Sequence, residues 1–342
     1  MRLSGDRSPR TFPVCAKSSD EDMQVVQARL QSAGEILLLT HARPDGDALG
    51  SMSALARSAE AVGKKCAAIC PEKPPRRYEF LLQGLRIASL EDFSDLAERS
   101  DCIAVLDTSS QSQLPGLAEA LRQVREKTVV IDHHQNPDKL ADVQWIDQSA
   151  AAVGVMLAEL IDSLAWPVPT GALEALATAI LTDTGWLSYA NTDVRTLRAV
   201  AKLVSAGVRP DGLYRRLYQN DRPQRAKLKA RLLEGLSLQC DGKLAVMTLT
   251  CEDFAKSDAD LSETEDLVNE AMNIATVELA TLFVEEKGQI RASLRSRGHV
   301  DVSLIARNFG GGGHAKAAGC RSESSLAAFR DALVRACTDA LG

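Results

Sequence analysis

The first stretch whose side chains could take part in chemistry runs from His41 to Asp47. One imidazole and two carboxylates fall within these few residues. The carboxylates belong to Asp45 and Asp47. Mixed nitrogen and oxygen donors of this kind suit Mn²⁺ or Mg²⁺ better than a thiolate zinc site would. The alternative without a metal is a polar turn in which an aspartate caps the following helix. The flanking residues decide where these side chains are placed.

A strand and a helix are predicted on either side of this stretch. Residues 35–40 are apolar, as in a buried parallel strand. Residues 47–62 carry apolar side chains at helical spacing and stop before Gly63. The stretch therefore lies at the carboxyl end of a strand, where open α/β sheets place their chemistry.

The same arrangement recurs further along the chain. Buried strands predicted over 101–107 and 128–134 and a helix over 170–181 deliver further acidic and imidazole side chains: Asp107, Asp132, His133, His134 and Asp183. Carboxylates that lie close together raise each other's protonation cost, and bound divalent cations remove this repulsion. Such a set around one crevice would hold two metal ions about 4 Å apart, as phosphoryl-transfer sites do.

The order of predicted elements defines the fold class. Strands that alternate with helices predict an N-terminal α/β domain with a doubly wound, mainly parallel sheet. A smaller C-terminal α/β domain with a mixed sheet follows, with the active-site cleft between the two. We expect a disordered leader at 1–22, the catalytic domain at 23–192, a helical linker at 193–235 and the second domain at 236–342.

Composition excludes several classes of protein. The formal net charge is -6 and aromatic residues make up 4% of the 342 residues, so no long nucleic acid is expected as a partner. No apolar run is long enough to span a membrane, and no membrane partner is expected. The eight cysteines form no C-x-x-C pair, which indicates a reducing, cytoplasmic location without structural zinc.

These residues resemble a known family in order and spacing. The motifs His41-x-x-x-Asp45-x-Asp47-x-x-Gly50-Ser51, Asp107, Asp132-His133-His134 and Asp183 resemble those of the DHH phosphoesterase superfamily. The segments Arg295-Ser296 and Phe309-Gly310-Gly311-Gly312-Gly313-His314 are similar to its DHH-associated C-terminal domain. The resemblance covers about residues 23–340, is closest to the nanoRNase/pAp-phosphatase branch, and shows no departure at the motif positions.

The resemblance implies a role for each motif residue. His41, Asp45 and Asp107 would ligate one metal ion. Asp47, Asp107, His133 and Asp183 would ligate a second, with Asp107 as the bridge. His134 would bind the scissile phosphate or protonate the leaving oxygen, and Asp132 would hold a histidine in the required tautomer.

The glycine run predicts a nucleotide clamp in the second domain. Consecutive glycines expose backbone N–H groups and admit a phosphate or a base closely. His314 adds a donor, and Arg295 can form a bidentate pair with phosphate. With the resemblance, the expected clamp is Arg295, Ser296, Gly311, Gly312, Gly313 and His314.

The function implied by the resemblance is phosphoester hydrolysis by hydroxide that two divalent ions activate, Mn²⁺ preferred and Mg²⁺ next. The expected substrates are short RNA oligonucleotides, cut to 5′-mononucleotides, and 3′-phosphoadenosine 5′-phosphate (pAp), cut to AMP and phosphate. The alternative within the enzymes is a phosphodiesterase for cyclic or linear signalling dinucleotides. The alternative from another class is a catalytically inactive nucleotide sensor. A homodimer is a further expectation.

Overall fold

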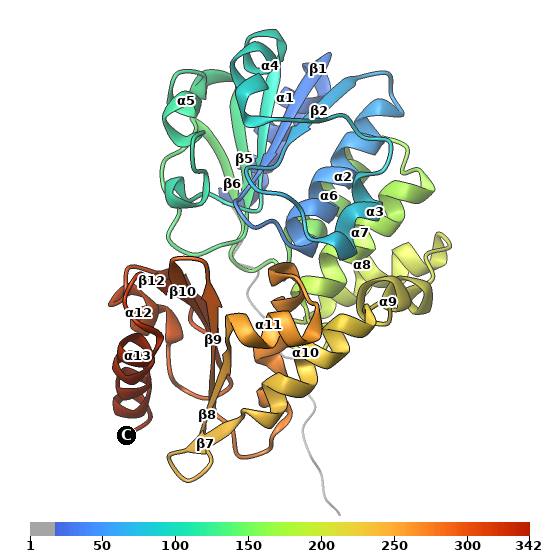
Figure 1. The fold of residues 1–342 in the computed structure, drawn as a ribbon. Helices are drawn as coiled ribbons and strands as arrows, with labels where there is room; N and C mark the ends of the chain where they lie inside the picture. Colours follow the sequence, from blue (N-terminus) through green and yellow to red (C-terminus); the bar gives the residue numbers. More distant parts are fainter. Residues whose placement is uncertain (1–17) are drawn as a thin grey trace, which may run out of the picture. The chain divides into compact units, whose positions relative to one another are not determined.

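The protein is described from a computed structural model that covers residues 18–342. The chain divides into two compact units, Met1–Gln219 and Asn220–Gly342 (Figure 1). Residues 1–17 of the expected leader lie outside the described residues, and the first helix begins at Ser18. No helix in the described part of the chain combines the length and apolar character needed to cross a membrane.

The first unit is built on a six-stranded sheet in the order β3-β2-β1-β4-β5-β6. Every neighbouring pair is parallel, which confirms the predicted doubly wound domain. The strand order changes direction between β1 and β4, and such switch points are where open α/β sheets bind ligands. The strands are β1 (Glu35–Thr40), β2 (Lys65–Ile69), β3 (Ile87–Ala88), β4 (Cys102–Leu106), β5 (Thr128–Asp132) and β6 (Val143–Ile146).

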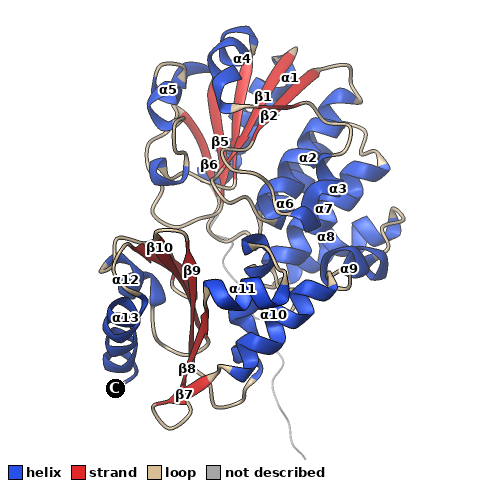
Figure 2. Ribbon diagram, viewed as in Figure 1, coloured by secondary structure: helices blue, strands red, loops and turns tan. Residues whose placement is uncertain are grey.

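Helices cover both faces of this sheet (Figure 2). Side chains of a strand alternate between faces, so Leu37 and Leu39 pack with α4 and α5, whereas Ile36 and Leu38 pack with α1, α2, α6 and α7. The helices are α1 (Ser18–Ser32), α2 (Gly46–Glu60), α3 (Glu79–Leu82), α4 (Phe93–Arg99), α5 (Ala118–Arg122), α6 (Val153–Ser163), α7 (Thr170–Asp183), α8 (Val194–Ser205) and α9 (Pro210–Tyr218). Short 3₁₀ turns are η1 (Arg76–Tyr78), η2 (Leu90–Asp92), η3 (Gln111–Gln113) and η4 (Arg125–Lys127).

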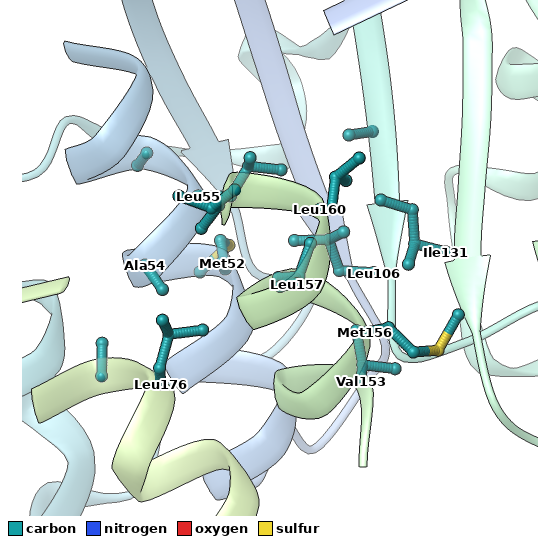
Figure 3. Close-up of a cluster of buried hydrophobic side chains, with 14 of the residues drawn as sticks. Met52, Ala54, Leu55, Leu106, Ile131, Val153, Met156, Leu157, Leu160 and Leu176 are labelled. Atoms are coloured by element: carbon teal, nitrogen blue, oxygen red, sulfur yellow. The ribbon is translucent and has the colours of Figure 1, made fainter. Parts of the chain in front are cut away.

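The α2, α6 and α7 helices pack unusually closely because glycines lie at their contacts. A Cβ added at Gly50 would lie 2.5 Å from the carbonyl oxygen of Ala175, and one at Gly154 would lie 2.5 Å from the Cβ of Ala179. Around these contacts the core is filled by side chains such as Met52, Leu157 and Leu176, together with side chains from the ends of β4 and β5 (Figure 3). The contact continues toward the C-terminal end of α7, where a Cβ at Gly46 would collide with the side chain of Thr182.

The second unit has a mixed six-stranded sheet in the order β11-β12-β10-β9-β8-β7, as predicted. Only β8 and β9 are parallel among its described pairs. The strands are β7 (Ser237–Gln239), β8 (Leu244–Leu249), β9 (Leu279–Glu286), β10 (Gln289–Ser296), β11 (Gly312–His314) and β12 (Ala317–Ser322). The remaining elements are α10 (Pro223–Glu234), α11 (Cys251–Ser257), η5 (Leu261–Thr264), η6 (Leu267–Asn273), α12 (Val302–Arg307) and α13 (Leu326–Leu341).

Three local features complete the description. The segment expected as a linker contains α8 and α9, which belong to the first unit, and α10, which belongs to the second. A capping box joins Asp260 and Glu263 at the start of η5. The last two glycines of the run, Gly312 and Gly313, begin strand β11, and a Cβ at Gly313 would lie 2.5 Å from the Ala317 oxygen of β12.

Candidate metal centre

The ends of β1 and β4 bring His41 and Asp107 together at the switch point of the sheet. His41 Nε2 lies 3.5 Å from Asp107 Oδ2, and the Asp107 side chain is 3% exposed. The backbone of Asp107 has a φ of 61°, a left-handed conformation that non-glycine residues adopt rarely and that clusters at functional sites. This backbone conformation therefore accompanies a buried carboxylate at the predicted site.

The predicted ligands form groups whose donor atoms lie within 4.8 Å of one another. The first group is His41, Asp45 and Asp107, the second is Asp47, His133 and Asp183, and a third, Asp107, His133 and His134, overlaps both. Asp107 Oδ1 lies 3.6 Å from His133 Nε2, so the two oxygens of this carboxylate face an imidazole from each group. His133 Nε2 also lies 3.5 Å from Asp183 Oδ2.

Both imidazoles are oriented by backbone carbonyl groups. The Nδ1 atom of His41 lies 2.7 Å from the Ala42 oxygen, and Nδ1 of His133 lies 3.0 Å from the Ala150 oxygen. A carbonyl oxygen only accepts, so each Nδ1 carries the proton. In the neutral imidazole, the lone pair then lies on Nε2 and points at the carboxylates, which is the orientation of a metal-ligating histidine.

Asp45 and Asp47 are fixed by helix N-termini. Asp45 Oδ1 caps α2 by accepting from the N–H groups of Asp47 and Ala48 at 3.0 and 3.1 Å, which leaves Oδ2 for another partner. Asp47, 1% exposed, accepts from the N–H groups of Val153 and Gly154 at 2.6 and 2.9 Å, at the start of α6. The capping interpretation of the turn is therefore correct for Asp45, and it is compatible with ligation through the second oxygen.

Asp183 stands at the opposite end of a helix. It is the last residue of α7, and Gly185, with a φ of 53°, ends the helix in a turn in which Trp186 N–H donates to the Leu181 oxygen at 2.6 Å. A carboxylate at a helix C-terminus is disfavoured by the helix dipole. The position makes sense if a cation lies beside it.

The electrostatics of the cluster agree with this view. Burial and the carboxylates of Asp47 and Asp45 raise the pKa of Asp107 well above its usual range. Burial and Asp47 also raise the pKa of Asp183 to about 7. Burial alone would lower the pKa of His133, but the carboxylates of Asp107, Asp183 and Asp47 raise it to about 9. The cluster holds protons that a bound cation would replace.

His134 and Asp132 form a separate pair beside the ligands. His134 Nδ1 lies 2.6 Å from Asp132 Oδ1, which also accepts from the backbone N–H groups of His133 and His134. Although burial acts to raise the pKa of Asp132, the hydrogen bond and the charge of His134 lower it to about 2. The contact of Nδ1 with Asp132 holds the ring of His134 in one orientation beside the ligand groups.

The residues fit a divalent cation. Their donors are carboxylate oxygens and imidazole nitrogens, which Mn²⁺ and Mg²⁺ accept. The buried Asp107 Oδ1 atom receives no hydrogen bond from the described residues. An unpaired buried oxygen is costly unless a ligand satisfies it. The first unit therefore holds a candidate site for divalent metal.

The expected clamp residues lie in the second unit. Arg295 on β10 donates from Nε to Asn269 Oδ1 at 3.0 Å. Strand register pairs Arg295 with Ala317, and Ala317 in turn with His314. Ser296 is buried on the opposite face of β10 from Arg295, and its Oγ atom has no hydrogen-bond partner among the described residues.

The glycines of the run differ from one another. A Cβ at Gly311 or Gly313 would collide with carbonyl oxygens of β12 at 2.1 and 2.5 Å, whereas a Cβ at Gly312 would meet open space. Packing against β12 therefore explains why positions 311 and 313 are glycines. Packing does not require a glycine at position 312, and the clamp as a whole stays a prediction.

Sequence reasoning missed the backbone and amide groups that hold the ligands. The backbone oxygen of Ala150 orients His133, and the N-terminus of α6 holds Asp47. The side-chain Nδ2 of Asn191 donates to the backbone oxygen of Asp183 at 3.1 Å. Backbone groups belong to every residue type, so no pattern of side chains could have indicated the first two.

The fold and the clustered carboxylates and imidazoles define a two-domain α/β protein with a candidate divalent-metal centre. Residues 35–180 match the DHH family, N-terminal domain, and residues 241–339 match the DHHA1 domain. The chain therefore belongs to the DHH phosphoesterase superfamily, in its nanoRNase/pAp-phosphatase branch.

Similar proteins agree with this placement. The chain is 31% identical over 329 residues to the bifunctional oligoribonuclease and PAP phosphatase NrnA of Thermus thermophilus, covering 92% of this chain and 96% of that protein. It is 29% identical over 287 residues to NrnA of Bacillus subtilis, with coverage of 83% and 88%. The crystal structure of an exopolyphosphatase-related protein from Bacteroides fragilis has the same fold, with a TM-score of 0.85, 23% identity and coverage of 92% and 96%.

Proposed function

We propose that the protein is a phosphoesterase that uses two divalent metal ions, with Mn²⁺ preferred and Mg²⁺ as the second choice. The observation that carries the proposal is Asp107, whose two oxygens lie 3.5 and 3.6 Å from imidazoles of two different ligand groups. One ion would be held by His41, Asp45 and Asp107, and the other by Asp47, Asp107, His133 and Asp183. Bound there, the ions would supply Lewis acidity toward water and neutralise charge on the phosphoryl oxygens.

The residues beside the ligands have separate tasks in this proposal. The Asp132 carboxylate fixes the His134 ring through Nδ1. His134 would bind the scissile phosphate or pass a proton to the leaving oxygen. The buried surroundings of Asp107 and Asp47 exclude water from the ligand side of the centre.

The proposed substrates are short oligoribonucleotides, released as 5′-mononucleotides, and pAp, released as AMP and phosphate. The names and coverage of the two NrnA relatives support this choice. The same two relatives favour these substrates over cyclic or linear signalling dinucleotides. Retention of every predicted ligand argues against an inactive nucleotide sensor. Arg295, Gly312 and His314 would hold the adjoining nucleotide, with Ser296, Gly311 and Gly313 shaping the strands around it.

One product-profiling experiment tests the proposal. Full-length protein stripped of metal is supplied with Mn²⁺, Mg²⁺ or Ca²⁺ and given an RNA dinucleotide, an RNA pentamer, pAp and a cyclic dinucleotide. We expect mononucleotides, AMP and phosphate with Mn²⁺, less product with Mg²⁺, and least with Ca²⁺, which prefers more ligands and longer bonds. Full activity without metal would refute the metal centre, and turnover of the cyclic dinucleotide alone would refute the substrate assignment.

We also propose that the protein is cytoplasmic and that it forms a homodimer. Cell fractionation tests the first, and light scattering of the full-length chain tests the second.

A further inference from the structure

The loop after α7 carries an asparagine that the sequence motifs leave without a role. Asn191 donates from its side-chain Nδ2 to the backbone oxygens of Asp183 and Ala151, each at 3.1 Å. An amide nitrogen carries two hydrogens, and both neighbours can only accept. The side chain can therefore fill this position in one orientation only, with its NH₂ group toward both carbonyl oxygens.

These two carbonyl groups belong to segments that hold metal ligands. Asp183 is itself a ligand of the second group, and its Oδ2 lies 3.5 Å from His133 Nε2. Ala151 follows Ala150, whose oxygen accepts from Nδ1 of His133. Asn191 thus joins the segment that carries one ligand to the segment that orients the other.

The first ligand group does not depend on this link. His41 and Asp107 lie at the ends of β1 and β4, and Asp45 is fixed by the N-terminus of α2. The two hydrogen bonds that Asn191 Nδ2 donates go to Ala151 and Asp183 and reach none of these elements. Loss of the Asn191 amide should consequently disturb one ion and spare the other.

We propose that Asn191 is a positioning residue that holds Asp183 and His133 at the spacing required for the second metal ion. This inference rests on the proposed two-metal centre. Groups that orient metal ligands from outside typically contribute 10- to 100-fold in metal affinity. We therefore expect Asn191→Ala to weaken one of two Mn²⁺ binding events by roughly 10- to 100-fold and to leave the other unchanged.

Metal-free, full-length protein is titrated with Mn²⁺. Calorimetry and the electron paramagnetic resonance signal of free Mn²⁺ both monitor the binding. Wild-type affinities at both sites in Asn191→Ala would overturn the inference. Equal weakening of both sites would overturn it as well. Circular dichroism and the melting temperature of the variant show whether it is folded.

Asn191→Asp separates positioning from simple electrostatics. The aspartate keeps the size of the side chain but has no hydrogen to donate, and it adds a negative charge near the cations. Electrostatics alone would tighten metal binding, whereas the positioning role requires weaker binding at the second site. Tighter binding in this variant would contradict the inference even if Asn191→Ala behaved as expected.

Ser188→Ala is the matched control in the same loop. Ser188 Oγ donates to the Gly185 oxygen at 2.5 Å, a local bond that links no ligand-bearing segments. We expect this variant to bind both ions as the wild type does, and a loss equal to that of Asn191→Ala would assign the effect to the loop in general. If the wild type itself binds fewer than two ions, the two-metal proposal fails, and the role of Asn191 fails with it. The ion count of the wild type therefore distinguishes this outcome from a failure of the Asn191 inference alone.

Discussion

Asp107 is the residue on which both ligand groups depend, because its two oxygens face His41 and His133. Asp107→Asn keeps the shape and tolerates the left-handed backbone, since asparagine adopts that conformation readily. We expect its Mn²⁺ content to fall well below two per chain. The matched variant Asp45→Asn should mainly weaken one site. Metal analysis after desalting measures both, and two tightly bound ions in Asp107→Asn would show that Asp107 is no bridge.

The same substitution should stabilise the protein when metal is absent. Asp107 is 3% exposed, and burial beside other carboxylates raises its pKa, so its charged form is unfavourable in the folded state. An asparagine amide could instead donate to the neighbouring carboxylates. We expect the free energy of unfolding in a chelator at pH 8 to rise by roughly 1–3 kcal/mol. Denaturant unfolding of both proteins measures this, and a lower stability of the variant would mean that the carboxylate is already well satisfied.

At the scale of elements, the contact between α2 and α7 places Asp183. A Cβ at Gly50 would lie 2.5 Å from a backbone oxygen of α7, so Gly50→Ala must push the helices apart. Overpacking of this kind costs about 1–3 kcal/mol, which outweighs the gain of about 1 kcal/mol in helix propensity. We expect a lower melting temperature together with weaker binding of the second metal ion.

Gly212→Ala in α9 is the control for this prediction. A Cβ there would lie 3.8 Å from its nearest neighbour, so only the propensity gain applies and the melting temperature should rise slightly. Calorimetric melting of the two variants gives the comparison. A stable Gly50→Ala protein with normal metal binding would mean that α7 can shift without moving Asp183.

The elements that could be predicted are those whose signal lies in side chains. Buried parallel strands such as 35–40 are continuous apolar runs, and the acids at their ends stand out against them. The strands β3, β6, β7 and β11 span only two to four residues, which is too short for a pattern of side chains to predict them, and β12 is interrupted by Gly319. Likewise, the candidate ligand residues could be named from the sequence. The link through Asn191 could not, because it depends on tertiary contacts with the backbone oxygens of Ala151 and Asp183.

At the scale of the whole molecule, the two units should have separable tasks. Arg295 would hold the nucleotide, and a lost bidentate contact to a charged group costs roughly 1.5–3 kcal/mol. We expect Arg295→Ala to lower kcat/KM on an RNA dinucleotide by roughly 10- to 100-fold. Hydrolysis of a small generic phosphodiester and the metal content should be nearly unchanged.

Arg291→Ala is the matched variant on the same strand. Arg291 is ion-paired with Glu286 within the unit, at 2.9 Å, so its loss reports the structural effect of removing an arginine from β10. Steady-state kinetics with both substrates distinguish the two variants. An equal loss on both substrates in Arg295→Ala would mean that Arg295 serves the chemistry or the fold rather than nucleotide binding.

The stability of the metal-free protein should fall as the pH rises, because of the raised pKa values of Asp183 and His133. The pKa of Asp183 is raised to about 7, so the folded state keeps a proton that the unfolded chain releases near pH 4. The pKa of His133 is raised to about 9, so its stabilising charge is present below about pH 6.5 and is lost as the pH rises toward 9. Both groups make the folded state bind more protons, and stability therefore falls as the pH rises.

We expect the free energy of unfolding in a chelator to fall by roughly 2–4 kcal/mol between pH 5 and pH 8. Saturating Mn²⁺ should remove this fall, because the cation replaces the protons and binds more tightly as the ligands deprotonate. Asp183→Asn removes one of the titrating groups, so its metal-free stability should depend less on pH. Urea unfolding across this range, with and without Mn²⁺, makes the comparison. Metal-free stability that rises toward pH 8 would show that the carboxylates are ionised in the folded protein without a cation, and that their mutual repulsion is relieved by some other group.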